Sequence, residues 1–134
     1  MDQTHASKIR AANAALVVGK QLDAVDAFFA PEYVGHGTAR DLTGPAAVRR
    51  FVAMLHEAFS ELEVDVEILV ESGDRVAWQR TLSGRQNGTF MGFPPTNRRI
   101  VWRDMVTSRL QDGRIAEDWV VTDLAEHLLL ARKS

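Results

Sequence analysis

The chain has 134 residues, of which 46% are hydrophobic and 25% charged, and its formal net charge is −2. This composition is typical of one globular domain spanning residues 1–134, and the mixed charges leave no basic surface for a nucleic-acid partner. The chain has no cysteine, which excludes disulfides and thiolate catalysis, and no apolar run of membrane-spanning or signal-peptide type. We therefore expect a soluble cytoplasmic protein that binds neither nucleic acid nor membrane.

The first 62 residues predict three helices joined by short connections. Helical spacing of apolar residues covers 6–20, with Thr4 as the cap, and 22–30, which Pro31 ends. Residues 32–37 are predicted to form a short extended segment. The third helix covers 42–62, and its apolar stripe consists of Val48, Phe51, Val52, Leu55 and Phe59.

After Ser60 the apolar period changes from 3.6 to 2, which predicts β-strands. The strands cover 62–72, 75–88, 99–111 and 114–123, and a short helix follows at 124–133. Asp112-Gly113 is a turn of the kind that joins antiparallel strands. Helices followed by such a meander predict an α+β fold, in which a cone-shaped, curved antiparallel sheet packs on the N-terminal helices with a single pocket between them.

One face of the predicted strands is apolar apart from a few charged side chains. Strict alternation assigns to this face Trp78 and Arg80 of the second strand, Trp102 and Asp104 of the third, and Trp119, Val121 and Asp123 of the fourth. The predicted substrate-binding residues are Trp78, Arg80, Trp102, Trp119 and Phe51. The predicted catalytic residues are Asp123, Asp104 and His36.

Two carboxylates in one apolar cavity suit acid–base chemistry. Burial raises the pKa of a carboxyl group, whereas a neighbouring Arg80 would lower it, so Asp104 and Asp123 are expected to differ in pKa. Such a pair can transfer a proton to or from carbon, or activate a water molecule. His36 is the histidine that we expect at the pocket mouth, because its flanking glycines allow a ligand to approach closely.

Structural interpretations of the same residues stay open. Asp104 and Arg80 could form a structural ion pair. Asp123, with Glu126 three residues later, matches a capping box for the final helix. A β-bulge in any strand would invert its face assignment. No histidine pair has metal-ligand spacing and no phosphate or dinucleotide motif is present, so the sequence predicts neither a metal nor a cofactor.

Three segments together resemble the SnoaL-like polyketide cyclases of the nuclear-transport-factor-2-like superfamily. The segments are "FFAPEYVGHG", "GTFMGFPPTNRR" and "LQDGRIAEDWVVTDLAEHLL", and the resemblance covers about residues 21–130. The first segment includes the family's histidine, here His36. In the second, Asn97 replaces the usual glycine and is the next-best residue for a positive φ angle.

The resemblance implies ring closure by intramolecular aldol condensation of a polyketide ester, without metal or organic cofactor. Asp123 matches the family's general acid/base. Characterised cyclases also carry a histidine on the strand before the final hairpin, whereas residues 99–111 contain none and Asp104 or Arg109 could take its place. The expected substrate is small, flat and largely apolar.

Other functions and a partner are also considered. The alternatives are an epoxide hydrolase or cofactor-free hydroxylase on the same fold, and a non-catalytic module that binds small molecules. On the outer sheet face, Val101, Met105 and Val120 interrupt a polar surface. These residues predict a homodimer or a higher even oligomer.

Overall fold

The computed structural model describes residues 4–37 and 40–133, so part of the predicted domain, at positions 1–3, 38–39 and 134, lies outside the described residues. In chain order the elements are α1 (His5–Asn13), the π-helical turn η1 (Ala14–Val18), the 3₁₀ turn η2 (Leu22–Ala24), α2 (Val25–Phe28), β1 (Phe29–His36), β2 (Asp41–Thr43), α3 (Pro45–Ala58), β3 (Phe59–Ser72), β4 (Arg75–Gln86), β5 (Arg99–Gln111), β6 (Arg114–Thr122) and α4 (Leu124–Lys133).

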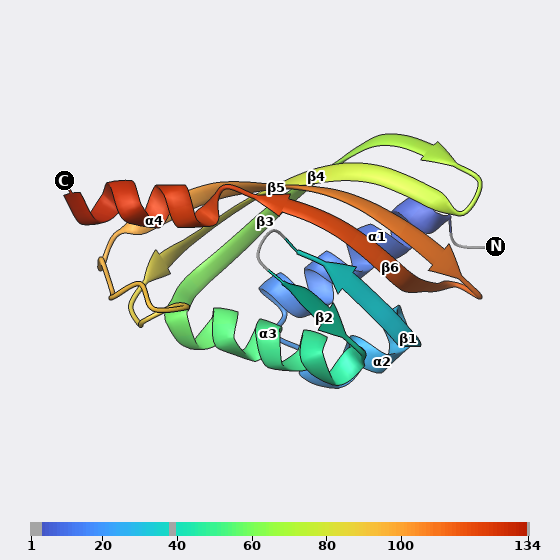
Figure 1. Ribbon diagram of the computed structural model, residues 1–134, viewed down its shortest axis with the longest axis horizontal. Helices are drawn as coiled ribbons and strands as arrows, with labels where there is room; N and C mark the ends of the chain where they lie inside the picture. The colour runs from blue at the N-terminus through green and yellow to red at the C-terminus, as the bar shows by residue number, and fades with distance from the viewer. Residues whose placement is uncertain (1–3, 38–39, 134) are drawn as a thin grey trace.

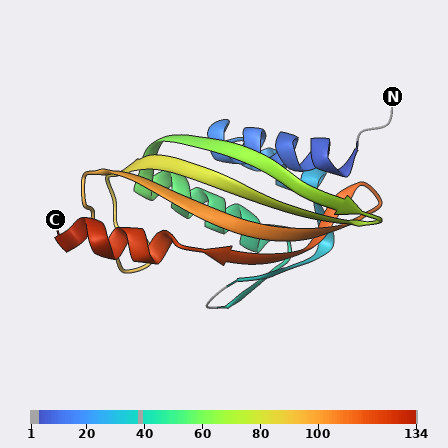
Figure 2. The same cartoon turned by 90° about the horizontal axis from the view of Figure 1, so that it is seen from above.

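The strands form one sheet in the order β2-β1-β6-β5-β4-β3. β3 to β6 are an antiparallel meander, whereas β1 pairs parallel to β6. Figure 1 shows the sheet curving over α1, α2 and α3, which cover one of its faces. Figure 2 shows β1 and β2 beside β6, and α4 continuing beyond the end of that strand. We call the helix-covered face the inner face and the opposite face the outer face.

The predicted α+β fold is confirmed, with helices on one face of a curved sheet. The sheet is mixed rather than purely antiparallel, because β1 adds in parallel at the edge of the meander. The predicted second helix reduces to a 3₁₀ turn and one α-helical turn, since the chain is already extended from Phe29 and pairs there with Ile115. α3 ends at Ala58 instead of residue 62 for the same reason, because Phe59 pairs with Gln86.

The local signals at turns and caps act as the sequence predicts. The Thr4 hydroxyl accepts a hydrogen bond from the Ser7 N–H at 3.0 Å and caps α1. Asn97 has a φ of 57°, and Asp112 and Gly113 also have positive φ in the β5–β6 turn. None of the helices that the structure describes is long and apolar enough to cross a membrane.

A β-bulge shifts the faces of β6. Arg109 pairs with Glu117, but the next β5 residue, Leu110, pairs with Ile115, so Ala116 is an extra residue on β6. Ile115 and Ala116 are both buried, and from there on the alternation runs one residue out of step with the predicted one. The inner face of β6 therefore carries Asp118, Val120 and Thr122 in place of the predicted Trp119, Val121 and Asp123.

The core beneath the sheet consists of two apolar clusters. The first lies around α1, β1 and the end of the sheet that contains Trp78 and Val106. The second lies around α3, α4 and the end that contains Leu82 and Trp102. Between these positions on the inner face, β4 contributes Arg80 and β5 contributes Asp104, which pair across the strands. A charged row thus separates the two apolar clusters.

Candidate active site

Arg80 and Asp104 form an ion pair under the middle of the sheet. Both Nε and Nη2 of Arg80 lie 2.9 Å from the same carboxylate oxygen, Asp104 Oδ2. The Asp104 side chain is only 7% exposed and that of Arg80 21%. The other carboxylate oxygen, Oδ1, is buried and has no hydrogen-bond partner among the described residues. Leaving a buried oxygen unpaired is costly, so Oδ1 is the unsatisfied acceptor of this ion pair.

The third nitrogen of the guanidinium group, Nη1, reaches a helix. It donates to the side-chain oxygen of Asn13 at 2.7 Å, and the Asn13 amide nitrogen donates to the Ile9 carbonyl at 2.9 Å. Asn13 is the last residue of α1 and is buried. Arg80 therefore links the sheet to α1, and each of its three nitrogens has a partner. Asn13 lies among the apolar residues of the helix stripe, so the helical pattern does not mark it as a site residue.

A second polar group lies farther along the inner face and centres on Asp118. The Tyr33 hydroxyl donates to Asp118 Oδ2 at 2.8 Å, and the Ser108 hydroxyl donates to Oδ1 at 2.5 Å. Trp78 Nε1 donates to the Ser108 oxygen at 3.0 Å. Strands β1, β4, β5 and β6 thus meet in one hydrogen-bonded network. Strict alternation assigns Asp118 to the outer face, so the sequence pattern does not reveal it as a site residue.

Burial controls the pKa values of this network. It raises the pKa of Asp118, and the hydrogen bonds from Ser108 and Tyr33 together with the charge of Arg80 offset only part of that effect. Burial also raises the pKa of Tyr33, and the nearby Asp118 raises it further. The Tyr33 phenol therefore keeps its proton and donates a hydrogen bond to the Asp118 carboxylate. Asp118 therefore holds a proton more readily than an aspartate in water.

Trp119 and His36 lie on the outer face rather than in the predicted pocket. The two rings stack with centroids 5.3 Å apart, and the Arg75 guanidinium carbon lies 5.0 Å from the Trp119 ring centroid. His36 Nε2 lies 2.6 Å from Glu117 Oε2, and its Nδ1 lies 3.5 Å from Asp41. The bulge in β6 accounts for the position of Trp119. The predicted roles of both residues at a pocket therefore lack the expected geometry.

Asp123 lies at the rim of the sheet, where β6 ends and α4 begins. Its carboxylate is 40% exposed. Oδ1 accepts the Arg103 backbone N–H at 2.7 Å, and Oδ2 lies 3.1 Å from Nε2 of His127, one turn into α4. Strict alternation assigned this carboxylate to the apolar face, and the bulge removes it from that face. Its contacts join the start of α4 to β5.

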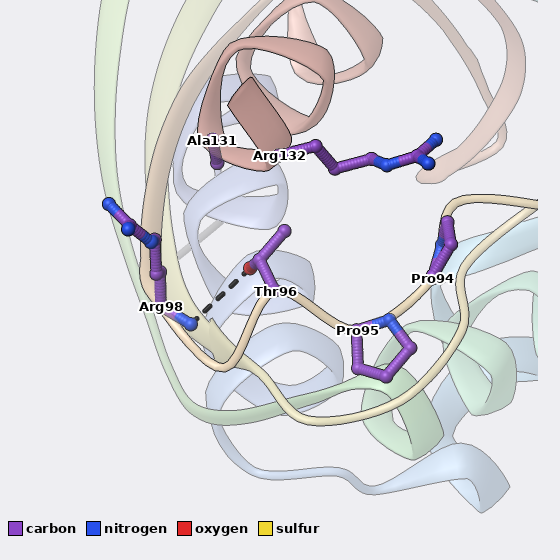
Figure 3. A pocket seen from close by; sticks show the side chains of 6 residues that line it. All are labelled: Pro94, Pro95, Thr96, Arg98, Ala131 and Arg132. Atoms are coloured by element: carbon purple, nitrogen blue, oxygen red, sulfur yellow. Dashed lines mark hydrogen bonds between the residues drawn. The ribbon is translucent and has the colours of Figure 1, made fainter. Parts of the chain in front are cut away.

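The remaining predicted residues lie in the second apolar cluster. Trp102 is buried there against Phe59, and Phe51 of α3 packs edge-on against Phe90. A hollow of about 310 Å³ opens at this end of the molecule. Figure 3 shows it between α4 and the β4–β5 connection. It is lined by Pro94, Pro95, Thr96, Arg98, Ala131 and Arg132, none of which is a predicted site residue.

The structure thus brings together four of the eight predicted site residues on the inner face: Trp78, Arg80, Trp102 and Asp104. It adds Asn13, Tyr33, Ser108 and Asp118 to them. In the described part of the chain, no group of three or more potential metal ligands is close enough to hold an ion. The buried acids, hydroxyls and one guanidinium group can exchange a proton with a ligand and offset a developing negative charge.

A curved sheet over helices, with acid–base groups beneath it, defines an α+β cone of the nuclear-transport-factor-2-like class. The structure of wild-type IdmH from Streptomyces antibioticus superposes with a TM-score of 0.82 and 26% identity, covering 98% of this chain and 100% of that one. The family model of SnoaL-like polyketide cyclases matches residues 7–129. The chain therefore belongs to the SnoaL-like polyketide cyclase family.

Two characterised relatives support this assignment. The nogalonic acid methyl ester cyclase of Streptomyces nogalater is 33% identical over 104 residues, which cover 72% of this chain and 76% of the relative. The aklanonic acid methyl ester cyclase DnrD of Streptomyces peucetius is 34% identical over 106 residues, which cover 72% and 71% respectively. The resemblance that the three sequence segments indicated is confirmed.

Proposed function

We propose that this protein closes a ring in a small polyketide-like ester by an aldol reaction, with Asp104 as the general base. The observation that carries the proposal is the buried Asp104 carboxylate, which binds Arg80 through one oxygen while the other is unpaired. Membership of the cyclase family and the two ester cyclases similar to this chain support the reaction class. The charged row lies between buried Trp78 and Trp102, so the proposed base has an apolar setting on both sides.

In the proposed reaction, Asp104 Oδ1 removes a proton from the carbon next to a carbonyl group of the substrate. The resulting enolate carbon attacks a second carbonyl group of the same molecule, and a carbon–carbon bond forms. The new alkoxide then takes the proton back from Asp104. No electron is gained or lost overall, so the step requires no redox cofactor. Arg80 offsets the negative charge that passes from carboxylate to enolate to alkoxide.

Asp123 was the first choice for this role from the sequence, and it has a different chemical setting. It is partly exposed and engaged by the Arg103 N–H and by His127. The Asp123 carboxylate lies outside the charged row and is not held in a dry interior. We therefore assign the proton transfer to Asp104 and no step to Asp123 or His36.

The direct test is turnover of nogalonic acid methyl ester by the purified wild-type protein, followed by product analysis. A cyclised product without added metal or cofactor is the expected result. The Arg80–Asp104 pair could also activate water, so terpene epoxides serve as the second substrate class. Diol formation from these epoxides, without cyclisation of the ester, would assign the protein to the hydrolase alternative. Binding of the ester without any turnover would favour the binding module.

We also propose a homodimer formed through the outer face. Val101 and Met105 of β5 and Val121 of β6 are all more than half exposed there, and Met105 pairs directly with Val121. Val120, which the sequence assigned to this face, packs against the first apolar cluster instead. On the same outer face, acidic Asp65 of β3 and basic Arg103 of β5 lie in one cross-strand row with Thr81 between them.

A further inference from the structure

We propose that Asn13 is a positioning residue, which holds Arg80 so that only one oxygen of Asp104 is used by the ion pair. This inference rests on the proposed function, in which the other oxygen, Oδ1, is the base. Arginine and carboxylate groups commonly pair through two parallel hydrogen bonds that use both carboxylate oxygens. Here two guanidinium nitrogens converge on Oδ2 alone. Something must therefore keep the guanidinium group from rotating onto Oδ1.

Asn13 is the group that can do so. It holds the remaining nitrogen, Nη1, at 2.7 Å, on the side of the guanidinium group away from the two nitrogens that bind Asp104. Rotation of Arg80 into the two-oxygen arrangement would break this bond and leave a buried amide oxygen unpaired. That loss opposes the rotation. The bond to Asn13 thus preserves the free oxygen that the reaction requires.

The orientation of the Asn13 amide is fixed by its second contact. The amide nitrogen donates to the Ile9 carbonyl within the same helix at 2.9 Å. A carbonyl oxygen can only accept a hydrogen bond. The amide nitrogen of Asn13 must therefore face the Ile9 carbonyl, and its amide oxygen must face Arg80. Asn13 is 5% exposed, a degree of burial that is uncommon for this residue type. The neighbouring buried residues of α1 are apolar, so these two hydrogen bonds are what accounts for an amide at this position.

The helix that carries Asn13 is itself anchored on both sides. Arg10, one turn earlier, donates to the Val66 carbonyl of β3 at 2.9 Å. The π-helical turn η1 begins directly after Asn13, and its Leu16 carbonyl accepts a hydrogen bond from His56 of α3 at 2.8 Å. π-helical turns are rare and are frequently found at functional sites. Asn13 therefore sits on a fixed support, as a positioning role requires.

The test compares two Asn13 variants with a matched control. Asn13→Leu keeps the approximate shape and removes the acceptor, whereas Asn13→Asp keeps an acceptor oxygen for Arg80. Ile9→Val, in the same helix, removes one buried methylene group and touches neither Arg80 nor Asp104. Crystal structures of the variants show where Arg80 lies without reference to activity. In Asn13→Leu, we expect Arg80 to contact both oxygens of Asp104, and in Asn13→Asp to contact Oδ2 alone.

Kinetics with nogalonic acid methyl ester provide the second measurement. Asn13→Leu should lower kcat by about tenfold to a hundredfold with little change in KM, because the base is occupied rather than the substrate excluded. Asn13→Asp should recover most of the loss, and Ile9→Val should stay within about twofold of the wild type. Equal losses in Asn13→Leu and Ile9→Val would show a merely structural role and overturn the proposal.

The two proposals fail in distinguishable ways. A wild-type protein that does not turn over the ester contradicts the proposed function, while the crystal structures still decide whether Asn13 orients Arg80. An Asn13→Leu structure in which Arg80 still binds Oδ2 alone contradicts the positioning role even if the enzyme is active. If Asn13→Leu does not fold, the Asn13→Asp structure decides the point, and Arg80 on both oxygens there overturns the proposal.

Discussion

At the scale of single residues, the inner face holds two buried carboxylates in opposite settings. Asp104 has a cationic partner and one unpaired oxygen, whereas Asp118 has both oxygens bound by neutral hydroxyl groups. Burial prevails at Asp118 and raises its pKa, because the two hydroxyl donors and the charge of Arg80 offset only part of the cost of desolvation. The two residues therefore suit different tasks. Asp104 can accept a proton, and Asp118 fastens strands together.

The raised pKa of Asp118 has a consequence for stability. Above the ordinary pKa of 3.8, the unfolded chain loses the Asp118 proton while the folded protein still holds it. The folded state binds more protons there, so stability falls as pH rises from 3.8 through the folded pKa. Asp118→Asn lacks this proton. In urea unfolding between pH 4 and 8, we expect the free energy of unfolding of Asp118→Asn to rise relative to that of the wild type as pH rises.

An exposed carboxylate provides the control for this prediction. Asp65→Asn on the outer face should leave the pH dependence of unfolding close to that of the wild type. The prediction concerns the trend with pH, so Asp118→Asn meets it even when it is less stable than the wild type at every pH, provided that the gap narrows as pH rises. A difference between Asp118→Asn and the wild type that is the same at every pH would contradict it.

The site residues on β4 and β5 could be predicted from the sequence, because these two strands pair without a bulge from Arg75 to Arg85. Strict alternation then assigns Trp78, Arg80, Trp102 and Asp104 correctly to the inner face. On β6 the same rule fails after one extra residue at Ala116. No local signal marks that bulge, since Ile115 and Ala116 are both ordinary strand-interior residues. Asn13 could not be predicted, because a helical pattern does not show that Arg80 extends to the end of α1 and binds there.

At the scale of elements, β1 is tied to β6 on both faces of the sheet. Tyr33 binds Asp118 on the inner face, and His36 binds Glu117 on the outer face. This pairing joins segments more than 80 residues apart and is parallel. The sequence predicted an extended segment at 32–37 but could not predict its partner, because β1 has no hairpin turn that leads to β6.

The outer-face contact makes the attachment of β1 pH-dependent. The hydrogen bond to Glu117 raises the pKa of His36, and Asp41 adds to this effect. His36 lowers the pKa of Glu117, with help from Arg109. The pKa of His36 is higher in the folded protein than its ordinary value of 6.5, so His36 stabilises the folded state fully below pH 6.5. This contribution to stability is lost as pH rises through the pKa of His36 in the folded protein. The Glu117 contribution is fully present above its ordinary pKa of 4.5 and is lost as pH falls through the lowered value.

We therefore expect the wild-type protein to lose stability as pH rises above 6.5 through the folded pKa of His36. His36→Gln keeps a hydrogen-bond donor for Glu117 but cannot carry a charge, so its unfolding should be less sensitive to pH in this window. Chemical unfolding of the two proteins at pH 6, 7 and 8 tests this expectation. His56→Gln is the histidine control, since His56 binds a backbone carbonyl instead of a carboxylate. Parallel curves for wild type and His36→Gln would refute the expectation.

At the scale of the whole molecule, the two sheet faces have different functions in our account. On the inner face, the charged row of Arg80 and Asp104 lies between two apolar clusters, so these acid–base groups are in a dry interior. The outer face exposes Met105 and Val121 side by side on a surface that is otherwise largely polar. The α+β class could be predicted because the three long helical stripes precede Ser60 and the four long alternating strands follow it. The bulge at Ala116 of β6 decides that Val121, and not Val120, faces outward.

The proposed dimer predicts how an outer-face substitution behaves. Met105→Glu places a charge at the centre of the exposed apolar group and should weaken dimerisation by about tenfold or more, because a buried unpaired charge is costly. Sedimentation equilibrium at micromolar concentration measures the change. Leu130→Glu, at an equally exposed position on α4, should leave the dimer intact. A wild-type protein that is monomeric at these concentrations would contradict the proposed interface.

The central claim is that a buried carboxylate at Asp104 performs the proton transfer. The measurement that tests it most directly compares kcat for nogalonic acid methyl ester in Asp104→Asn, Asp104→Glu and Asp123→Asn, each with a thermal unfolding scan. We predict that Asp104→Asn loses about a hundredfold or more, as expected for removal of a general base. Asp104→Glu, which keeps the charge but displaces it, should also lose most of its activity, and Asp123→Asn should stay within a fewfold of the wild type. A folded Asp104→Asn variant with undiminished turnover, or a large loss in Asp123→Asn alone, would contradict the account.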